Sequence, residues 1–379
     1  MARFAAALSE HPLATQATGE IIGQVLEELG PAPDLAIIFV TGPFGGAIED
    51  IARTVRSVLN PRVLIGAVAV SVLAGAREVE DTPAISLWAA RFDLDLEPVR
   101  LEAFRTGGDE ILIAGGGVIG RDSGTLIVLA DPFSFPTPEI LEHLGDAAPG
   151  VTIIGGLASS GRGPGGNTLV LDDERFTDGA VGVWLPPEVA ITPVVSQGCR
   201  PIGDALTVTR SERNVIYELA GQPALDRLMG LIETLSAEDR TVAAKGLHVG
   251  IVLDEQSVDD AGREFLIRGV VGADRTAGAV AVSADVDVGA TIQFQVRDAV
   301  SAHEQLGRLM TGRHPASALV FTASERGSSL FGQPNHDASE VSSAIDGRPV
   351  AGMFCSGEIG PVGGKNRLHS LAASIALFG

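Results

Sequence analysis

The chain has 379 residues, and its 27 lysines and arginines against 48 aspartates and glutamates give a formal net charge of −21. A surface of this sign repels the phosphates of nucleic acids and of anionic membranes, which argues against both as partners. Two cysteines, Cys199 and Cys355, are too few for a disulfide framework and form no C-x-x-C zinc motif. We expect a cytoplasmic protein that is long enough for two domains.

No stretch of the sequence predicts a secretion signal or a membrane-spanning helix. The apolar run near the N-terminus, Phe4–Leu8, is shorter than the roughly 7 to 15 residues of a signal-peptide core. The longest apolar run, Val63–Ala76, contains Ser71 and is shorter than the roughly 18 residues that a spanning helix needs.

The first predicted element is a helix between Pro12 and Gly30, where apolar residues recur every three to four positions. Three blocks that share one order of elements are distributed along the rest of the chain: apolar strand, helix, apolar strand with a glycine, loop and apolar strand. They are block one (Leu35–Ala90), block two (Leu126–Leu185) and block three (Ala318–Phe378).

The spacing inside the blocks is also alike. The glycine of the second strand lies 25, 25 and 30 positions beyond the end of the first strand (Thr41 to Gly66, Ala130 to Gly155, Thr322 to Gly352). We expect the blocks to superpose as duplicated β-α-β-β units, because three copies are too few for an open array. The predicted fold is mixed α/β, with two domains of internally repeated β-α-β-β units and mixed sheets covered by helices.

Two glycine-rich motifs have the spacing of nucleotide sites without their context. Gly115, Gly117 and Gly120 form a G-x-G-x-x-G pattern, but turn residues and a strand follow where a helix must begin. The P-loop pattern before Lys365 lacks its first glycine and its final Ser or Thr. We therefore predict no bound cofactor and no metal.

A helix predicted after Asp298 carries His303 on a stripe with Val300, Leu306 and Met310, so we interpret His303 as a core residue. Further along, Asp337 and Glu340 have the spacing of a helix-capping pair.

The stretch Pro349–Phe378 places glycines and polar residues between two apolar strands. Glycine allows the backbone to approach a small molecule, and polar side chains then orient it. An exposed, charged hairpin tip is the alternative interpretation. In a β-α-β-β unit the strand ends meet at one rim, so the loop Glu325–Asp337 belongs to the same predicted site. The candidate ligand-binding residues are Arg326, Gly327, His336, Glu358, Gly360, Asn366 and His369.

Arg326 and Glu358 carry the chemistry of this prediction. The planar guanidinium of Arg326 suits a carboxylate and the carboxylate of Glu358 suits an ammonium group, which together fit an amino-acid-like ligand. The alternative is an ion pair between Arg326 and Glu358 that braces the turn.

Nine short motifs carry a resemblance that extends along nearly the whole chain. They are LIG at 64–66, REVE at 77–80, ADPFSFP at 130–136, GGLASSGRGPGGN at 155–167, VSQGCRPIG at 195–203, LFG at 330–332, HD at 336–337, GEIGPVGG at 357–364 and LH at 368–369. In these motifs the chain resembles the FIST family, named for F-box and intracellular signal transduction.

The resemblance implies an N-type domain at 1–220 and a C-type domain at 221–379, in a stand-alone protein of the kind met in actinobacteria. It implies a sensor of amino acids or related polar metabolites in intracellular signal transduction, with no catalytic residues. A signalling protein is the expected partner, and the sequence also admits a homo-oligomer. A haem-based nitric-oxide sensor is a minor alternative.

The enzyme alternative is a hydrolase or transferase acting on a small amide or ester. Cys355 would be its nucleophile, His369 its base and Glu358 the residue that orients the base. The family usually has a small inert residue where this chain has Cys355, which weakens this hypothesis.

Overall fold

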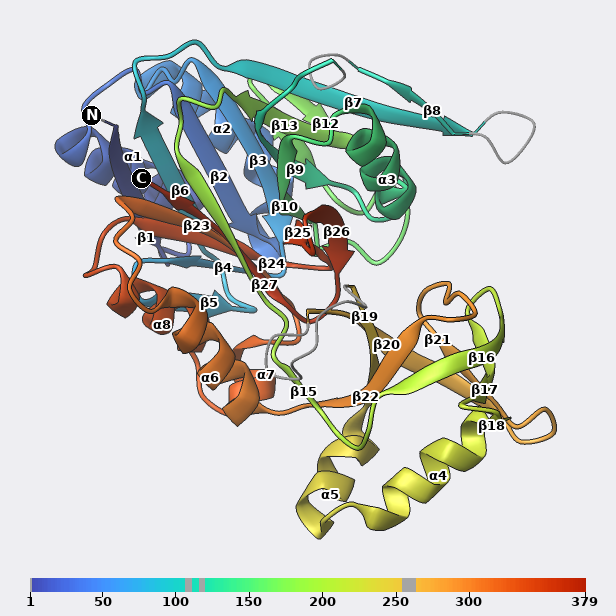
Figure 1. Ribbon diagram of the computed structural model, residues 1–379. Helices are drawn as coiled ribbons and strands as arrows, with labels where there is room; N and C mark the ends of the chain where they lie inside the picture. Colours follow the sequence, from blue (N-terminus) through green and yellow to red (C-terminus); the bar gives the residue numbers. More distant parts are fainter. Residues whose placement is uncertain (1, 106–110, 116–119, 254–263) are drawn as a thin grey trace. The chain divides into compact units, whose positions relative to one another are not determined.

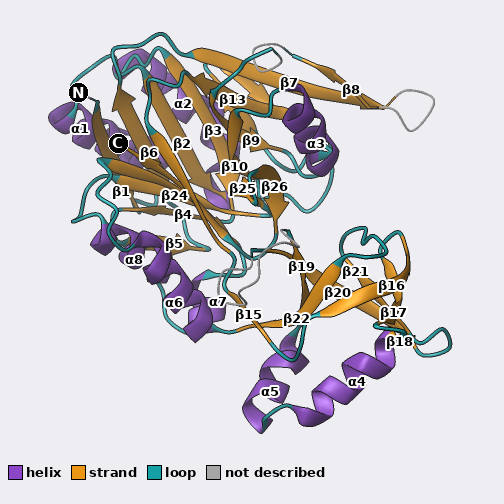
Figure 2. Ribbon diagram, in the orientation of Figure 1, coloured by secondary structure: helices purple, strands orange, loops and turns teal. Residues whose placement is uncertain are grey.

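A computed structural model describes residues 2–105, 111–115, 120–253 and 264–379 (Figures 1 and 2). The chain forms two compact units. Unit 1 comprises residues 1–196, 307–361 and 365–379, and unit 2 comprises 197–306 and 362–364. Mixed sheets that carry helices confirm the predicted mixed α/β fold. Within the described ranges, no helix is long and apolar enough to cross a membrane.

Unit 1 contains all three predicted blocks. In each block a helix joins the first strand to the second, and these two strands pair in parallel. The last strand of the block pairs antiparallel with the first. Block one uses β2 (Leu35–Thr41), α2 (Ile48–Val58), β3 (Val63–Ala69) and β6 (Ile85–Arg91). Block two uses β9 (Gly124–Ala130), α3 (Thr137–Ala147), β10 (Val151–Leu157) and β13 (Ala180–Leu185). Block three uses β23 (Ser317–Ala323), α8 (His336–Ala344), β24 (Val350–Cys355) and β27 (Ala373–Phe378).

The three predicted glycines occupy corresponding places in these pairings. Each lies in the second strand, opposite a residue of the first: Gly66 with Ile38, Gly155 with Val128, and Gly352 with Val320. A Cβ atom on the glycine would lie 2.7, 1.8 and 1.9 Å, respectively, from the carbonyl oxygen of that partner. Glycine is therefore required because the neighbouring backbone passes too close for a side chain. The correspondence of the three glycines is confirmed, and the duplication of the blocks stays a prediction.

The loop of each block is a hairpin that pairs with the sheet of another block (Figure 1). The hairpin β4–β5 (Ser71–Ala74 and Arg77–Glu80) of block one pairs with β24 of block three. The hairpin β25–β26 (Glu358–Val362 and Lys365–His369) of block three pairs with β10 of block two. The hairpin β11–β12 (Leu169–Leu171 and Glu174–Phe176) of block two pairs with β3 of block one. The exchange is cyclic and joins the three blocks into one body.

A further strand precedes each block and pairs with its last strand. These strands are β1 (Arg3–Ser9), β7 (Glu97–Arg105) and β14 (Ile191–Ser196). Their starting positions are evenly spaced, since 97 − 3 = 94 and 191 − 97 = 94. Between β7 and block two lies β8 (Ile111–Ala114), an edge strand. The predicted G-x-G-x-x-G motif follows β8, and its Gly117 lies outside the described residues. Since β9 begins at Gly124, the described part of the motif leads into a strand.

The core of unit 1 lies between its three sheets. Inward-facing residues of all three form one apolar cluster, in which Trp88 packs 4.8 Å from Phe378 between ring centroids. The outer face of the first sheet is covered by α1 (Ala14–Glu28) and α2, and that of the second sheet by α3 (Figure 2). The short helices η1 (Gly42–Ala47) and α7 (Gly327–Phe331) follow the first strands of blocks one and three.

Unit 2 consists of an eight-stranded sheet, β15–β22, with the helices α4 (Ala224–Thr234) and α5 (Ala237–Lys245) packed on one face. The strands are β15 (Cys199–Pro201), β16 (Leu206–Glu212), β17 (Val215–Leu219), β18 (Gln222–Pro223), β19 (Leu247–Val252), β20 (Phe265–Asp274), β21 (Ala279–Val282) and β22 (Thr291–Arg297). In the sequence, residues 197–306 of unit 2 lie between β14 and β23. Both of these strands belong to one sheet of unit 1, where each pairs with β27.

The prediction that His303 is a core residue is wrong. On α6 (Ala299–Met310) the buried stripe consists of Ala302, Leu306 and Met310, which recur every four positions, and His303 is exposed beside it. Val300, which the predicted stripe also included, is 66% exposed.

Candidate functional site

Arg326 is the largest charged side chain buried in unit 1. It precedes α7 and has no exposed surface. Its Nε donates to Oδ2 of Asp337 at 2.6 Å and its Nη2 donates to Oδ1 at 2.8 Å. The Thr322 hydroxyl also donates to Oδ2, at 2.6 Å. Asp337 therefore holds the guanidinium in one orientation through two parallel hydrogen bonds.

The electrostatics of this pair depend on both partners being present. Burial alone raises the pKa of Asp337, but the charge and hydrogen bonds of Arg326 hold that pKa well below its usual range. Burial likewise opposes the charge on Arg326, and Asp337 outweighs it, so the pKa of Arg326 is raised. The third guanidinium nitrogen, Nη1, is buried and has no hydrogen-bond partner among the described residues. A buried charged donor that faces no acceptor is costly in an apolar setting.

Arg326 forms its ion pair with Asp337. This corrects the alternative interpretation from the sequence, in which Glu358 is the partner. The sequence spacing predicts Asp337 as a helix-capping residue, but Asn335 is the residue that precedes α8 and no side-chain cap bond forms there. Asp337 is the second residue of the helix, and its carboxylate accepts from Arg326 and Thr322. Glu358 still acts on Arg326, because its charge contributes to raising the arginine pKa.

Glu358 lies on β25 and is completely buried. Its Oε2 accepts a hydrogen bond from the N–H of Ala372 at 2.8 Å. Because β25 pairs with β10, with Glu358 opposite Gly156, the block-three hairpin carries this carboxylate to the edge of the block-two sheet.

A third buried carboxylate, Glu78, reaches the same region on the block-one hairpin. Its Oε1 accepts from the N–H of Ala338 at 2.9 Å, and its own N–H donates to Oδ1 of Asn335 at 2.8 Å. Burial, assisted by the charges of Asp337 and Glu80, raises the pKa of Glu78 from 4.5 to about 7. Its Oε2 has no hydrogen-bond partner among the described residues. We call Glu78, Arg326, Asp337 and Glu358 the buried charge cluster.

Sequence reasoning missed Glu78 as a site residue. The local signals are the REVE motif in which Glu78 lies and its position in β5 next to the buried Val79. Its contacts with Asn335 and Ala338 are separated from it by 257 and 260 positions, so no local pattern reports them.

Glu80 explains the glycine at position 327. The Glu80 carboxylate accepts from the backbone N–H of Ser328 at 3.0 Å and from its hydroxyl at 2.7 Å. Gly327 has a φ of +20°, and a Cβ there would lie 2.9 Å from the nearest Glu80 oxygen. Gly327 therefore allows the block-one hairpin to approach the segment that carries Arg326.

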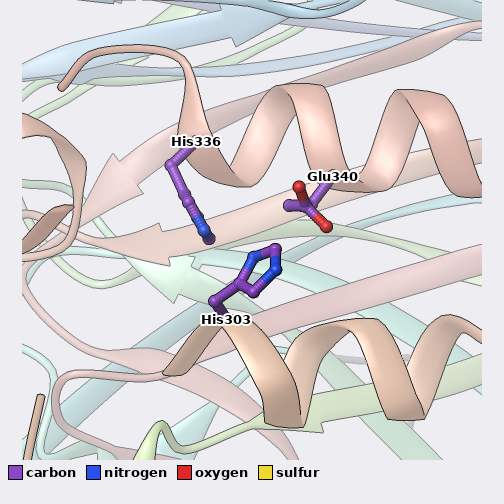
Figure 3. A group of neighbouring side chains, drawn as sticks. All are labelled: His303, His336 and Glu340. Carbon is purple, nitrogen blue, oxygen red and sulfur yellow. The ribbon is translucent and has the colours of Figure 1, made fainter. Parts of the chain in front are cut away.

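His336 is the first residue of α8 and is 8% exposed. Its Nδ1 lies 3.0 Å from Oδ1 of Asp337, and its ring stacks on Phe331 with 3.4 Å between centroids. The Phe331 ring also lies 5.3 Å from the guanidinium carbon of Arg326. Figure 3 shows His336 and Glu340 one turn apart on α8. His303 in that view comes from α6, in the part of the helix that belongs to unit 2.

The other predicted residues stabilise the block-three hairpin. His369 is buried, and its Nε2 lies 2.9 Å from the carbonyl oxygen of Gly360. A Cβ at Gly360 would lie 2.5 Å from the Ser374 hydroxyl, so glycine is required by packing. Asn366 bonds the edge of β10 with both ends of its amide, through the Val151 carbonyl and the Ile153 N–H, each at 2.8 Å.

Cys355 does not have the properties of a nucleophile. Its side chain is completely buried in the core of unit 1. Burial, with a smaller contribution from Glu358, raises the pKa of its thiol well above the usual value. The reactive form of cysteine is the thiolate, which this environment disfavours at neutral pH. This environment therefore disfavours attack by Cys355 on a substrate, which is the first step of the hydrolase alternative.

Comparison with protein families decides what kind of chain this is. The model of the FIST N domain matches residues 34–222, and that of the FIST C domain matches residues 224–361. The chain belongs to the FIST family. The two matches meet close to the predicted division between residues 220 and 221, whereas the compact units are divided at other positions because residues 307–361 pack in unit 1.

Two mycobacterial relatives show the extent of the similarity. An uncharacterized protein of Mycobacterium bovis is 40% identical over 376 residues, which are 97% of this chain and 96% of that protein. An uncharacterized protein of Mycobacterium tuberculosis is 39% identical over 385 residues, 99% of each chain.

Three of the nine motifs that carry the FIST resemblance contribute residues to the buried charge cluster. The REVE motif contains Glu78 and Glu80, and the HD motif consists of His336 and Asp337. The GEIGPVGG motif contains Glu358. Motifs that are far apart in this FIST protein therefore supply side chains to one buried region of unit 1.

Proposed function

We propose that this FIST protein is a sensory protein that binds an amino acid or a related polar metabolite at the buried charge cluster. FIST domains are associated with sensing in signal transduction. The observation that carries the proposal is the buried Nη1 of Arg326, a charged donor with no hydrogen-bond partner among the described residues. Asp337 already binds the other side of the guanidinium.

The chemistry of the cluster favours a carboxylate as the group that Arg326 binds. Burying a charged side chain costs several kcal/mol of effective desolvation free energy, by order of magnitude, even when it is paired. A guanidinium held by one carboxylate still presents donors in a fixed plane, which is the geometry that carboxylates accept. Glu358 supplies a negative charge nearby for an ammonium group.

The remaining predicted residues have supporting parts in this proposal. His336 and Phe331 form an aromatic stack next to Arg326. Gly327 allows the approach of the block-one hairpin, while Gly360, Asn366 and His369 fix the hairpin that carries Glu358. In this proposal a signalling protein in the cytoplasm binds the ligand-bound form. The proposal also includes association of the chain with copies of itself.

The test is a thermal-shift screen of the wild type and two variants against the proteinogenic amino acids. A ligand at about 100 times its Kd adds about 2.7 kcal/mol to the free energy of unfolding. We expect at least one amino acid to raise the melting temperature of the wild type by several degrees. Arg326→Lys should lose this shift, because an ammonium group cannot reproduce the planar fork.

Arg200→Lys is the matched control. Arg200 of unit 2 is also held by carboxylates, in its case those of Asp239 and Asp298. Its replacement should lower stability and leave the ligand shift unchanged. If no amino acid shifts the wild type, or if Arg326→Lys responds as the wild type does, the proposed site is wrong. A product released during the screen would indicate the hydrolase alternative, and a stoichiometric Soret band would indicate haem.

A further inference from the structure

The block-one hairpin brings a carboxylate to a site that otherwise belongs to block three. Glu78 is 5% exposed, and one of its oxygens is engaged by the backbone of α8 through Ala338. The other oxygen, Oε2, is buried and has no hydrogen-bond partner among the described residues. The charge of Glu78 acts on Arg326, whose buried Nη1 also has no hydrogen-bond partner among the described residues.

These two atoms are complementary in chemistry. Nη1 of Arg326 can only donate a hydrogen bond, and an ionised Glu78 can only accept one. Both belong to side chains that are held from the opposite side, Arg326 by Asp337 and Glu78 by the N–H of Ala338. A ligand that carries a carboxylate and an ammonium group offers a partner to each of these atoms.

We propose that Glu78 accepts a hydrogen bond from the ammonium group of the ligand, in addition to the negative charge that Glu358 supplies, and that this contact couples ligand binding to the release of a proton from Glu78. The proposal rests on the proposed function, since it assigns the ligand's cationic half to a residue of that same site. It adds a binding residue from block one, so two blocks together recognise one ligand.

The proton coupling follows from the charges that face Glu78. Asp337 on α8 and Glu80 on the same strand oppose its ionisation, and Arg326 favours it. His336 lies next to Asp337. With a pKa of about 7, Glu78 is mostly protonated at pH 6 and mostly ionised at pH 8. A cation binds the ionised form, so the affinity should be about tenfold higher at pH 8 than at pH 6.

Methylammonium chloride is the probe for the cationic half alone. Tetramethylammonium chloride has the same charge but no hydrogen-bond donor, and it serves as the control salt at equal concentration. We expect methylammonium to raise the melting temperature of the wild type above that in tetramethylammonium, with about tenfold weaker apparent binding at pH 6 than at pH 8. Glu78→Gln should abolish the difference between the two salts.

Glu80→Gln is the matched variant, because Glu80 belongs to the same hairpin and binds Ser328 instead. It should keep the methylammonium response. Equal shifts with both salts in the wild type, as expected if Oε2 of Glu78 bonds water alone, would overturn the proposal. A full response of Glu78→Gln would overturn it too. Should Glu78→Gln show no cooperative unfolding, the pH dependence in the wild type decides, and a response independent of pH counts against the proposal. Sodium acetate tests the Arg326 half separately, so a failure of the proposed function is distinguished from a failure of the Glu78 assignment.

Discussion

Block three differs from blocks one and two at one corresponding backbone amide. The residue before the last strand of each block is Ala84, Gly179 or Ala372, and its buried N–H is bonded by a side chain. In blocks one and two the acceptor is a hydroxyl, from Thr41 and Ser134, whereas in block three it is the carboxylate of Glu358. In blocks one and two a neutral hydroxyl is enough to bond this N–H. The backbone of block three therefore does not require the negative charge of Glu358. A charge that the backbone does not require is expected of a binding site.

The largest effects should come from the glycines that make the three blocks comparable. Gly155→Ala and Gly352→Ala place a Cβ within 2 Å of a backbone oxygen, and we expect each to cost more than about 4 kcal/mol of unfolding free energy. Gly66→Ala should cost less, because its clash distance of 2.7 Å is longer. Urea unfolding monitored by circular dichroism measures all three.

Gly23→Ala is the control for the glycine series. Gly23 lies in α1, and a Cβ added there would have no neighbouring atom within 4 Å, so alanine should add about 0.5 to 1 kcal/mol. Tolerance of Gly352→Ala beside intolerance of Gly155→Ala would break the correspondence between blocks two and three.

Breaking the buried pair of block three should cost nearly as much. Asp337→Asn leaves the Arg326 guanidinium buried beside a neutral partner, and the expected loss is about 3 to 5 kcal/mol. Arg326→Ala should destabilise similarly, because it leaves the Asp337 carboxylate buried without its ion-pair partner. The double variant Arg326→Met with Asp337→Leu should recover much of the loss, because it buries no charge. A double variant no more stable than Asp337→Asn contradicts this account of the pair.

The ionisation of Glu78 should appear in the pH dependence of stability. Its folded-state pKa of about 7 lies above its ordinary 4.5, so protonation stabilises the folded state. The contribution is complete below pH 4.5 and is lost as the pH rises through 7. Relative to Glu78→Gln, the wild type should lose about 3 kcal/mol of unfolding free energy between pH 4.5 and pH 8. Urea unfolding across this range checks it, and parallel pH profiles for the two proteins contradict it.

The smallest effects should come from the three acceptors themselves. Thr41→Val and Ser134→Ala each leave a buried N–H without its acceptor, which costs about 1 to 3 kcal/mol. Glu358→Gln keeps an acceptor oxygen for Ala372 and should cost less than about 1 kcal/mol. Thermal unfolding of the three variants gives the comparison. A loss for Glu358→Gln as large as for Thr41→Val indicates that the carboxylate is scaffolding.

Local sequence patterns predicted the three blocks because each parallel pair and its helix are encoded by nearby residues. The sequence predicts a loop at the place of each hairpin, with a hairpin as the alternative in block three. The few residues of each hairpin carry little periodicity, and the partner strand lies in another block. For the same reason the sequence predicts only some members of the buried charge cluster. Arg326 and Glu358 lie within block three, whereas the contribution of Glu78 depends on the exchange of hairpins. On α6 the pattern correctly predicts Leu306 and Met310 as buried, but the buried residue of the preceding turn is Ala302, and His303 lies on the surface.

Isothermal titration calorimetry of wild type, Glu358→Gln and Ser134→Ala tests most directly whether the charges of block three serve a ligand. The titrant is the amino acid that gives the largest thermal shift. We predict that Glu358→Gln weakens binding at least tenfold while its melting temperature stays within a few degrees of the wild type, and that the less stable Ser134→Ala binds with unchanged affinity. Equal affinities for wild type and Glu358→Gln would contradict the account, because the carboxylate would then serve the fold alone.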